Sequence, residues 1–213
     1  MSQKGVLHLP IQKHLRKYFI MGRQNCERNP EVILKEALQA GITMFQFREK
    51  GKGALIGKAK IELGKKLRRL CFDYKVPFII NNDVDLVETL EVNGIHVGQG
   101  DTPVAELRQQ FPNLYIGLSV STREELNNSP LDVVDYIGAG PVYTTHTKED
   151  AITAVGTEWI TYVREKHPNL PFVGVGGINA LNAKQVIEAG ADGVAVVSAI
   201  TASDDVAQTV KSF

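Results

Sequence analysis

Short apolar segments alternate with amphipathic stretches along this chain of 213 residues. Most of the segments are four or five residues of Val, Ile and Phe without clean alternation, the pattern of strands buried on both faces. Strands separated by helices predict repeated βα units and a parallel sheet. The eight predicted strands cover Tyr18–Met21, Thr43–Phe47, Phe78–Ile80, Gly94–Val97, Tyr115–Leu118, Val133–Ile137, Phe172–Val175 and Gly193–Val197.

The amphipathic stretches carry signals for helix ends. Pro30 precedes the sequence EVILKEALQAG, so we expect a helix that begins near the proline and ends just before Gly41. A second helix is predicted over residues 54–74, where apolar residues recur at helical spacing. A third is expected between an N-cap at Asn179 and a C-cap at Gly190.

The positions of the glycines decide between two ways of arranging such a sheet. The first predicted strand is not followed by the G-x-G-x-x-G of a doubly wound dinucleotide-binding sheet. Glycine-rich segments lie at the seventh and eighth strands instead, and the loops there commonly build a phosphate site in a barrel. We therefore expect an α/β fold, a single (β/α)8 TIM barrel over residues 1–213, with a short N-terminal helix that closes its floor.

The charge balance and the cysteines limit the partners. Lys and Arg together number 24, as do Asp and Glu, so nothing favours nucleic acid or an anionic membrane. Cys26 and Cys71 lie far apart in the sequence, which argues against a zinc site or a disulfide framework. No apolar stretch resembles a signal peptide or a membrane span. A soluble, cytoplasmic protein that binds small molecules is predicted, and the sequence leaves a homo-oligomer open.

The segment after the second predicted strand gathers two cations and an amide. Strand alternation points Gln46, Arg48 and Lys50 to one side. It points Phe47 and Glu49 to the other. The active site of a barrel lies at the C-terminal ends of its strands, where such cations would suit a polyphosphate. The alternative is a solvated, charged loop.

Oxygen ligands follow the next two strands. Asn81, Asn82 and Asp83 come after the third strand, and Asp101 comes after the fourth. Mg²⁺ usually binds one or two carboxylates together with waters and substrate phosphates, so these residues are candidate ligands. The alternative is that Asn82, Asp83 or Asp101 caps the helix that follows it.

The loop after the sixth strand combines hydroxyl groups with a cation. Residues 140–148 include Thr145, Thr147 and Lys148, and the stretch beyond has no strong apolar period. Long loops on this face of a barrel often bind ligands or act as lids. His146 is a candidate acid or base, although a lone histidine in a loop is more often a bystander.

Glycines and serines mark a second anion site. Residues 174–178 read Gly-Val-Gly-Gly-Ile after the seventh strand, and Ser198 follows the eighth. Glycine lets backbone N–H groups approach an anion, and a helix that begins near Ser198 would add its positive end. Ser119, at the end of the fifth strand, is a phosphate donor or a helix cap. A basic diphosphate pocket, a metal site and a monophosphate site together predict two phosphorylated substrates.

The ordered set of these motifs resembles the thiamine-phosphate synthase family from Tyr18 to Ile200. The resemblance implies a transferase of thiamine biosynthesis that uses Mg²⁺ to join hydroxymethylpyrimidine diphosphate to thiazole phosphate. The products would be thiamine phosphate, diphosphate and, from a carboxylated thiazole, CO2. The segments that carry the resemblance are GITMFQFREKG, VPFIINND, GIHVGQGD, IGLSVS, DYIGAGPVYTTHTK, VGVGGI and EAGADGVAVVSAI.

The resemblance also implies a dissociative mechanism and roles for individual residues. Diphosphate would leave a pyrimidine-methyl carbocation, which the thiazole nitrogen attacks, so no protein nucleophile is needed. The Mg²⁺ ligands would be Asn82 and Asp101. The catalytic residues would be Arg48, Lys50, Ser119 and Lys148. The pyrimidine diphosphate would contact Gln46, Phe47, Arg48, Glu49, Lys50, Asn81, Ser119 and Lys148. The thiazole phosphate would contact Thr145, His146, Thr147, Gly177, Val197 and Ser198.

Two positions depart from the family pattern. The family usually has Asp where this chain has Asn82, which predicts weaker Mg²⁺ binding because an amide carries no negative charge. Thr144 stands where the family often has proline. The change at Asn82 keeps open a thiazole tautomerase, a relative with the same barrel. A non-catalytic thiazole- or thiamine-phosphate-binding protein and another phosphate-binding barrel, such as an isomerase or aldolase, are further alternatives.

Overall fold

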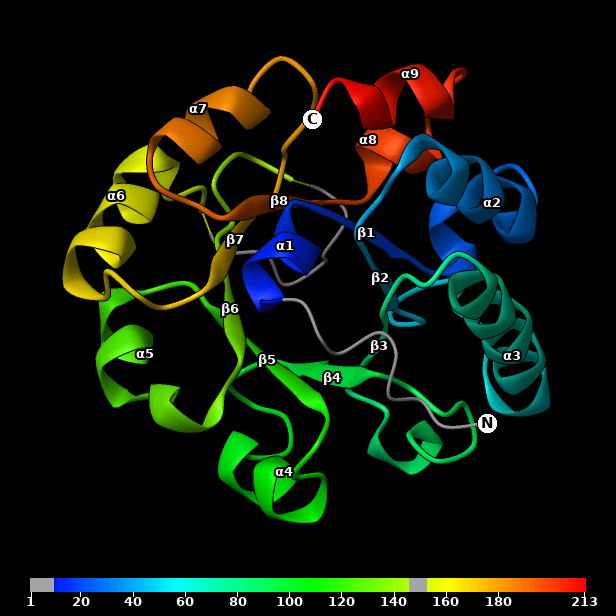
Figure 1. The fold of residues 1–213 in the computed structure, drawn as a ribbon, viewed down its shortest axis with the longest axis horizontal. Coiled ribbons are helices and arrows are strands. Elements are labelled where there is room, and N and C mark those ends of the chain that lie inside the picture. The colour runs from blue at the N-terminus through cyan, green and yellow to red at the C-terminus, as the bar shows by residue number, and fades with distance from the viewer. Residues whose placement is uncertain (1–9, 146–152) are drawn as a thin grey trace.

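Eight parallel strands close into a barrel in chain order, with β1 paired to β8 (Figure 1). This computed structural model describes residues 10–145 and 153–213. The closed barrel confirms the predicted fold class. The strands are β1 (Lys17–Met21), β2 (Met44–Phe47), β3 (Phe78–Asn81), β4 (Gly94–Val97), β5 (Tyr115–Val120), β6 (Tyr136–Ala139), β7 (Phe172–Val175) and β8 (Gly193–Val196).

Helices surround the barrel, and the 3₁₀ turn η3 takes the place of a full helix between β3 and β4 (Figure 1). In the described ranges, no helix is long and apolar enough to cross a membrane. The helices are α1 (Ile11–Leu15), α2 (Pro30–Ala40), α3 (Gly57–Asp73), α4 (Val104–Gln110), α5 (Arg123–Asn128), α6 (Gly156–Lys166), α7 (Ala183–Glu188), α8 (Ser198–Thr201) and α9 (Val206–Lys211), with 3₁₀ turns η2 (Arg23–Asn25), η3 (Val84–Leu86) and η4 (Leu131–Val133).

Helix α2 begins and ends where its sequence predicts. The side chain of Asn29 accepts a hydrogen bond from the backbone N–H of Glu31, and Pro30 occupies the first turn. Gly41 ends the helix with a φ of 97°, a left-handed conformation that glycine adopts at little cost. The cap, the proline and the glycine together define this element.

Three predicted boundaries were wrong by three residues. The helix expected over residues 54–74 begins at Gly57, and the other two errors share one cause. The sixth strand was expected over Val133–Ile137, but Val133 ends the 3₁₀ turn η4, and β6 begins three residues later, at Tyr136. The helix expected after Asn179 begins only at Ala183. In both cases a local turn precedes the regular element: the Asn179 side chain accepts from the backbone N–H of Leu181 within such a turn.

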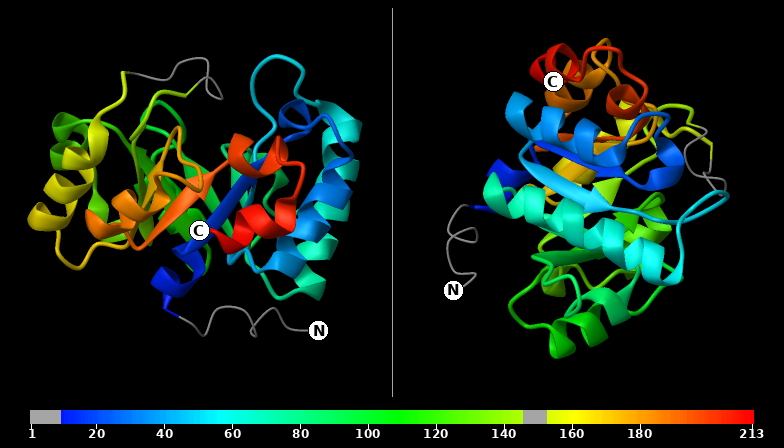
Figure 2. Two further views of the ribbon diagram at one scale, coloured as in Figure 1. Left: turned by 90° about the horizontal axis from the view of Figure 1, so that it is seen from above. Right: turned by 90° about the vertical axis from the view of Figure 1, so that its right-hand side faces the viewer.

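The apolar side chains form two layers. The larger layer lies between the outer face of the barrel and the helices. The smaller layer fills the barrel and includes Leu15 of α1 packed with Tyr18, Met44 and Ile79. Helix α1 therefore closes the floor of the barrel, as predicted. The loop over residues 48–56 lies at the opposite end (Figure 2).

The same arginine–aspartate arrangement occurs twice near the N-terminal ends of the strands. Arg108 of α4 donates to the carboxylate of Asp135 at 2.6 Å, and this carboxylate accepts an N–H from β5. Arg164 of α6 donates to Asp192 at 3.0 Å, and that carboxylate accepts an N–H from β7. Each arginine also donates to two carbonyls of the loop after its own helix. These clamps tie a helix, a loop and two strands together away from the site described below.

Candidate active site

A cavity lined by polar and apolar side chains opens at the C-terminal ends of the strands. Most residues predicted to bind substrate or metal line it, so the fold brings together groups from all parts of the sequence. Those residues are Gln46, Arg48, Lys50, Asn81, Asn82, Asp101, Ser119, Thr145, Gly177, Val197 and Ser198.

The segment after β2 divides its side chains between the cavity and the protein interior. The backbone N–H of Arg48 donates to the carbonyl of Met21 at 3.0 Å, which continues the pairing of β1 with β2 beyond the strand end. Arg48 and Lys50 line the cavity. Phe47 is buried in the outer apolar layer, and Glu49 directs its carboxylate to backbone N–H groups. The lining therefore excludes Phe47 and Glu49, in keeping with the predicted alternation.

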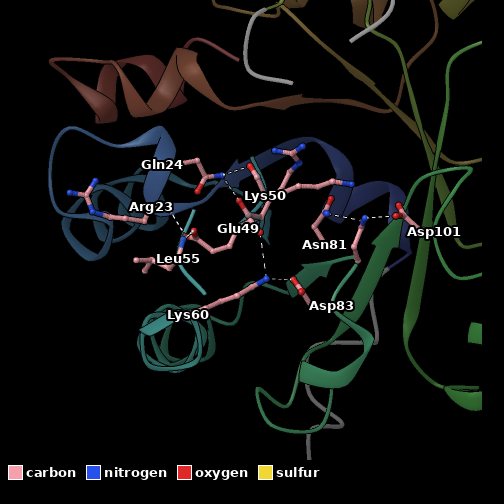
Figure 3. A network of polar contacts seen from close by, with 11 residues as sticks. Arg23, Gln24, Glu49, Lys50, Leu55, Lys60, Asn81, Asp83 and Asp101 are labelled. Atoms are coloured by element: carbon pink, nitrogen blue, oxygen red, sulfur yellow. Dashed lines mark hydrogen bonds and ion pairs between the residues drawn. The ribbon is translucent and has the colours of Figure 1, made fainter. Parts of the chain in front are cut away.

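Amide and carboxylate side chains meet at the ends of β3 and β4. Asn81 Nδ2 donates to Asn82 Oδ1 at 2.7 Å, and Asn82 Nδ2 donates to Asp101 Oδ1 at 2.6 Å. Asn82 thus links Asn81 to Asp101 by two hydrogen bonds, which are drawn as dashed lines in Figure 3. Asp101 Oδ2 accepts the N–H of Gly98 at 2.7 Å. Asn82 has a φ of 62°, in the left-handed region that asparagine tolerates better than most residues.

These contacts contradict the helix-capping alternative for the candidate metal ligands. Helix α4 begins after Pro103 without a side-chain cap, so Asp101 does not cap it. Turn η3 likewise has no side-chain cap from Asp83. The Asp83 carboxylate instead pairs with Lys60 Nζ at 2.6 Å (Figure 3). Asn82 and Asp101 thus remain beside the cavity, while Asp83 is engaged elsewhere.

A chain of hydrogen bonds crosses the inner end of the cavity and links side chains of β1, β2, β4, β5 and β6. Gln46 Nε2 donates to the Tyr18 hydroxyl at 2.8 Å, and that hydroxyl lies 2.8 Å from the Tyr136 hydroxyl. His96 Nδ1 lies 3.1 Å from the Tyr136 hydroxyl, and His96 Nε2 lies 2.9 Å from Ser119 Oγ. We call these five residues the polar chain.

The polar chain holds its members by contacts on both sides. Gln46 donates to the Tyr18 oxygen. Either tyrosine hydroxyl can donate to the other, and each His96 nitrogen donates or accepts according to the tautomer. Burial raises the pKa of Tyr18 and of Tyr136 above the ordinary value, so both hydroxyls keep their protons. The contact with His96 holds the Ser119 hydroxyl in place at the cavity.

Glycines and a short helix form the part of the cavity wall that follows β7 and β8. Gly176 and Gly177, after β7, have φ values of 97° and 62°. A Cβ at Gly177 would approach the Thr144 carbonyl to 2.5 Å, so a side chain there would have to displace the loop after β6. Helix α8 begins at Ser198. Loops after the seventh and eighth strands of a barrel and the N-terminus of a short helix commonly bind phosphate.

Three predicted site residues, His146, Thr147 and Lys148, lie outside the described residues. Thr145, the last described residue before them, lines the cavity. The predicted roles of these three residues stay predictions.

Comparison with known proteins agrees with this geometry. The sequence profile of the family described as thiamine monophosphate synthase matches residues 17–200. The chain belongs to this family. The match begins with β1 and ends in α8, so it includes every strand that contributes to the cavity.

Members of the thiamine monophosphate synthase family align with almost the whole chain. A thiamine-phosphate synthase of Oceanobacillus iheyensis is 60% identical over 204 residues, which cover 95% of this chain and 99% of that protein. A thiamine-phosphate synthase of Staphylococcus saprophyticus is 48% identical over 204 residues, with coverages of 95% and 96%. The predicted family, enzyme class and function are thereby confirmed: the chain is a transferase of the thiamine-phosphate synthase type.

Solved structures confirm the fold. Thiamine phosphate pyrophosphorylase from Pyrococcus furiosus superposes with a TM-score of 0.84 at 32% identity, and the alignment covers 95% of each chain. A 3-hexulose-6-phosphate synthase has a TM-score of 0.61 at 14% identity, over 92% of this chain and 97% of that one. The second structure shares only the barrel with this member of the thiamine monophosphate synthase family.

The oxygen ligands of this family member suit a magnesium ion with one carboxylate. The described residues contain no group of three or more His, Cys, Asp or Glu side chains placed to hold a metal. Asp101 would supply the carboxylate, and Asn82, which now donates to it, would supply an amide oxygen if its amide group turned over. Mg²⁺ is commonly held by one or two carboxylates with waters and substrate phosphates. The donor set therefore fits Mg²⁺ chemically.

Sequence reasoning missed Gln24, Tyr18 and Tyr136. A tyrosine on an inward-facing strand position needs a partner for its hydroxyl, and this need could have pointed to Tyr18 and Tyr136. Gly117 leaves the space for them, because a Cβ there would collide with the Tyr136 ring and the imidazole of His96. No local pattern marks Gln24, whose contacts are described below.

Proposed function

We propose that this chain joins hydroxymethylpyrimidine diphosphate to thiazole phosphate, with thiamine phosphate and diphosphate as products, and with CO2 when the thiazole is carboxylated. One observation supports this assignment above all. Two sets of anion-binding groups line one cavity: Arg48 and Lys50 after β2, and Gly176, Gly177 and Ser198 after β7 and β8. Two phosphorylated substrates could therefore meet there.

The chain would promote the departure of diphosphate with fixed charges. Arg48 and Lys50 would face the diphosphate. Lys148, which follows the sixth strand in the sequence, would be a third cation. Arg48 can hold two phosphate oxygens with its planar fork, whereas each lysine acts as a point charge. The Ser119 hydroxyl, held in place by His96, would be a further hydrogen-bond donor to the diphosphate. Donors fixed before the reaction stabilise developing charge without having to reorganise.

The second substrate would be held for attack on the pyrimidine-methyl carbocation. Its phosphate would accept the backbone N–H groups near Gly177 and Ser198, with Thr145 and Thr147 as hydroxyl donors. Binding of the phosphate near Gly177 and Ser198 would orient the thiazole nitrogen toward the reacting carbon. Correct placement of two reactants can supply a large share of a rate enhancement.

Asn82 and Asp101 would hold the Mg²⁺ ion. The bound ion would neutralise part of the charge on the diphosphate. We further infer that the reaction takes place in the cytoplasm, because Cys26 and Cys71 are both free, buried thiols. No nucleic-acid or membrane partner is needed for it.

The direct test is to incubate the pure protein with both substrates, with and without Mg²⁺, and to measure thiamine phosphate and released diphosphate. Equal amounts of both products, formed only with Mg²⁺, would support the proposal. Absence of product together with binding of thiazole phosphate would contradict it and favour a tautomerase or a binding protein.

A further inference from the structure

Reciprocal hydrogen bonds join the loop after β1 to the segment after β2, beside the cavity. Gln24 Nε2 donates to the carbonyl oxygen of Arg48 at 2.8 Å and to that of Lys50 at 3.3 Å. In return, Glu49 Oε1 accepts the backbone N–H of Arg23. The main chain on both sides of Glu49 is thus held by the neighbouring loop (Figure 3).

The second oxygen of the same carboxylate closes the loop in which it lies. Glu49 Oε2 accepts the backbone N–H of Leu55 at 2.7 Å. Lys60 Nζ lies 3.4 Å from the Glu49 carbonyl oxygen and 2.6 Å from the Asp83 carboxylate, which connects the segment to the end of β3. Glu49 itself is only 7% exposed. A buried carboxylate whose two oxygens both accept backbone N–H groups holds the chain at two points.

Gly22 allows the loop after β1 to approach the segment after β2 closely. A Cβ at that position would lie 2.7 Å from Gln24 Nε2 and would collide with the Arg48 carbonyl oxygen. A larger residue would therefore push apart the two groups that form the hydrogen bond. The close approach of the two loops is built into the sequence at Gly22, Gln24 and Glu49.

We propose that Gln24 and Glu49 are positioning residues for the two cations that face the diphosphate. They hold the main chain at Arg48 and Lys50, so that both side chains point into the cavity. Two neighbouring cations repel each other and would otherwise spread over many rotamers, and ordering long side chains costs entropy. This inference rests on the proposed function, because the diphosphate is the ligand that needs both cations in place.

A purely structural role is the competing explanation, and the chain offers a matched control. The Asp192 carboxylate also accepts a backbone N–H, at 2.9 Å from Phe172, but it belongs to a clamp away from the cavity. Asp192→Asn should lower the Tm without changing phosphate binding. Glu49→Gln keeps the shape but turns an NH2 group toward one of the two N–H donors. Gln24→Met keeps the length and removes the donor to Arg48 and Lys50.

The experiment is calorimetric titration of the full chain with inorganic diphosphate in the presence of Mg²⁺, alongside Tm and steady-state kinetics. In Glu49→Gln and Gln24→Met we expect about tenfold weaker diphosphate binding, the size of effect that follows from one lost hydrogen bond. The KM for the pyrimidine diphosphate should rise in parallel, whereas the KM for thiazole phosphate should stay at the wild-type value. Asp192→Asn should bind diphosphate as the wild type does.

Wild-type diphosphate affinity in Gln24→Met would overturn the inference, and so would an equal rise in both KM values. Gln24→Met keeps the test decisive if Glu49→Gln does not fold. Failure of the proposed function has a different signature: the wild type would bind diphosphate, the two variants would bind it more weakly, and none of the proteins would form thiamine phosphate.

Discussion

The side-chain amide of Asn82 donates a 2.6 Å hydrogen bond to Oδ1 of Asp101. Without a metal, this contact satisfies a carboxylate that a second acidic residue would repel. A metal ion at the same place would have to replace it with an oxygen of Asn82. The asparagine thus favours the metal-free arrangement and adds no negative charge to the metal site.

Asn82→Asp should therefore tighten Mg²⁺ binding and destabilise the metal-free protein. We expect the Mg²⁺ concentration for half-maximal activity to fall about tenfold, because a second carboxylate ligand adds charge attraction. The Tm without Mg²⁺ should fall, since two carboxylates would then lie side by side. Activity and Tm measured against Mg²⁺ concentration test both effects. An unchanged Mg²⁺ requirement in the variant would refute this account.

Lys148→Ala should lower turnover far more than it alters folding. Removing one group that stabilises developing charge typically costs about 10²–10³ in kcat. The Tm should stay near the wild-type value, because lysine side chains are rarely part of an apolar core. Near-normal turnover in this variant would exclude the proposed role of Lys148 on the leaving diphosphate.

Tyr136→Phe should interrupt the polar chain between Tyr18 and His96. Leaving buried partners unsatisfied should cost about 1–3 kcal/mol of unfolding free energy. It should also release the Ser119 hydroxyl from its orientation and lower kcat/KM for the pyrimidine diphosphate by about tenfold. Ser119→Ala should cause most of the same fall in kcat/KM. The fall in the double variant should therefore be smaller than the sum of the two single falls in log kcat/KM. Strict additivity of the two changes in log kcat/KM would show that Tyr136 does not act through Ser119.

Stability should decline in alkaline solution. Burial raises the pKa of Cys26 to about 11 and raises those of Tyr18, Tyr136 and Cys71 above their ordinary values. The folded-state pKa values exceed the unfolded ones, so the unfolded chain loses protons first and rising pH favours it. The contribution of these groups should be complete below about pH 8.5, where unfolded thiols are still protonated, and should fall steadily above it. Denaturant titrations across this range test the slope, with Cys71→Ser as the variant expected to weaken it.

Arg164→Ala should unfold more easily while keeping its activity. The guanidinium donates hydrogen bonds to three backbone carbonyls and to one carboxylate. Loss of these charged hydrogen bonds should cost about 2–3 kcal/mol of unfolding free energy. Arg108→Ala should behave similarly, because it makes the equivalent set of contacts. Urea denaturation measures the loss, and kcat/KM under native conditions should stay at the wild-type value. A large fall in kcat/KM would show that these clamps act on the cavity.

Local sequence patterns were enough to predict the barrel, its closing helix and the side of the molecule on which the site lies. Apolar segments without alternation predict strands buried on both faces, and strand ends in a parallel barrel all meet at one mouth. Alternation also predicted that Arg48 and Lys50 would face away from Glu49. Less could be predicted at element boundaries, where local turns at residues 131–133 and 179–182 moved the start of β6 and α7.

The contacts of the polar side chains follow from tertiary structure alone. Tyr18 and Tyr136 are separated by 118 positions, yet their hydroxyls lie 2.8 Å apart because both side chains belong to the layer inside the barrel. Glu49 binds the N–H of Arg23 for a related reason, since the loops after β1 and β2 pack together. Such contacts depend on strand register and on which loop folds over which strand end. Neither is encoded in a local pattern of residues, because both follow from closing the whole barrel.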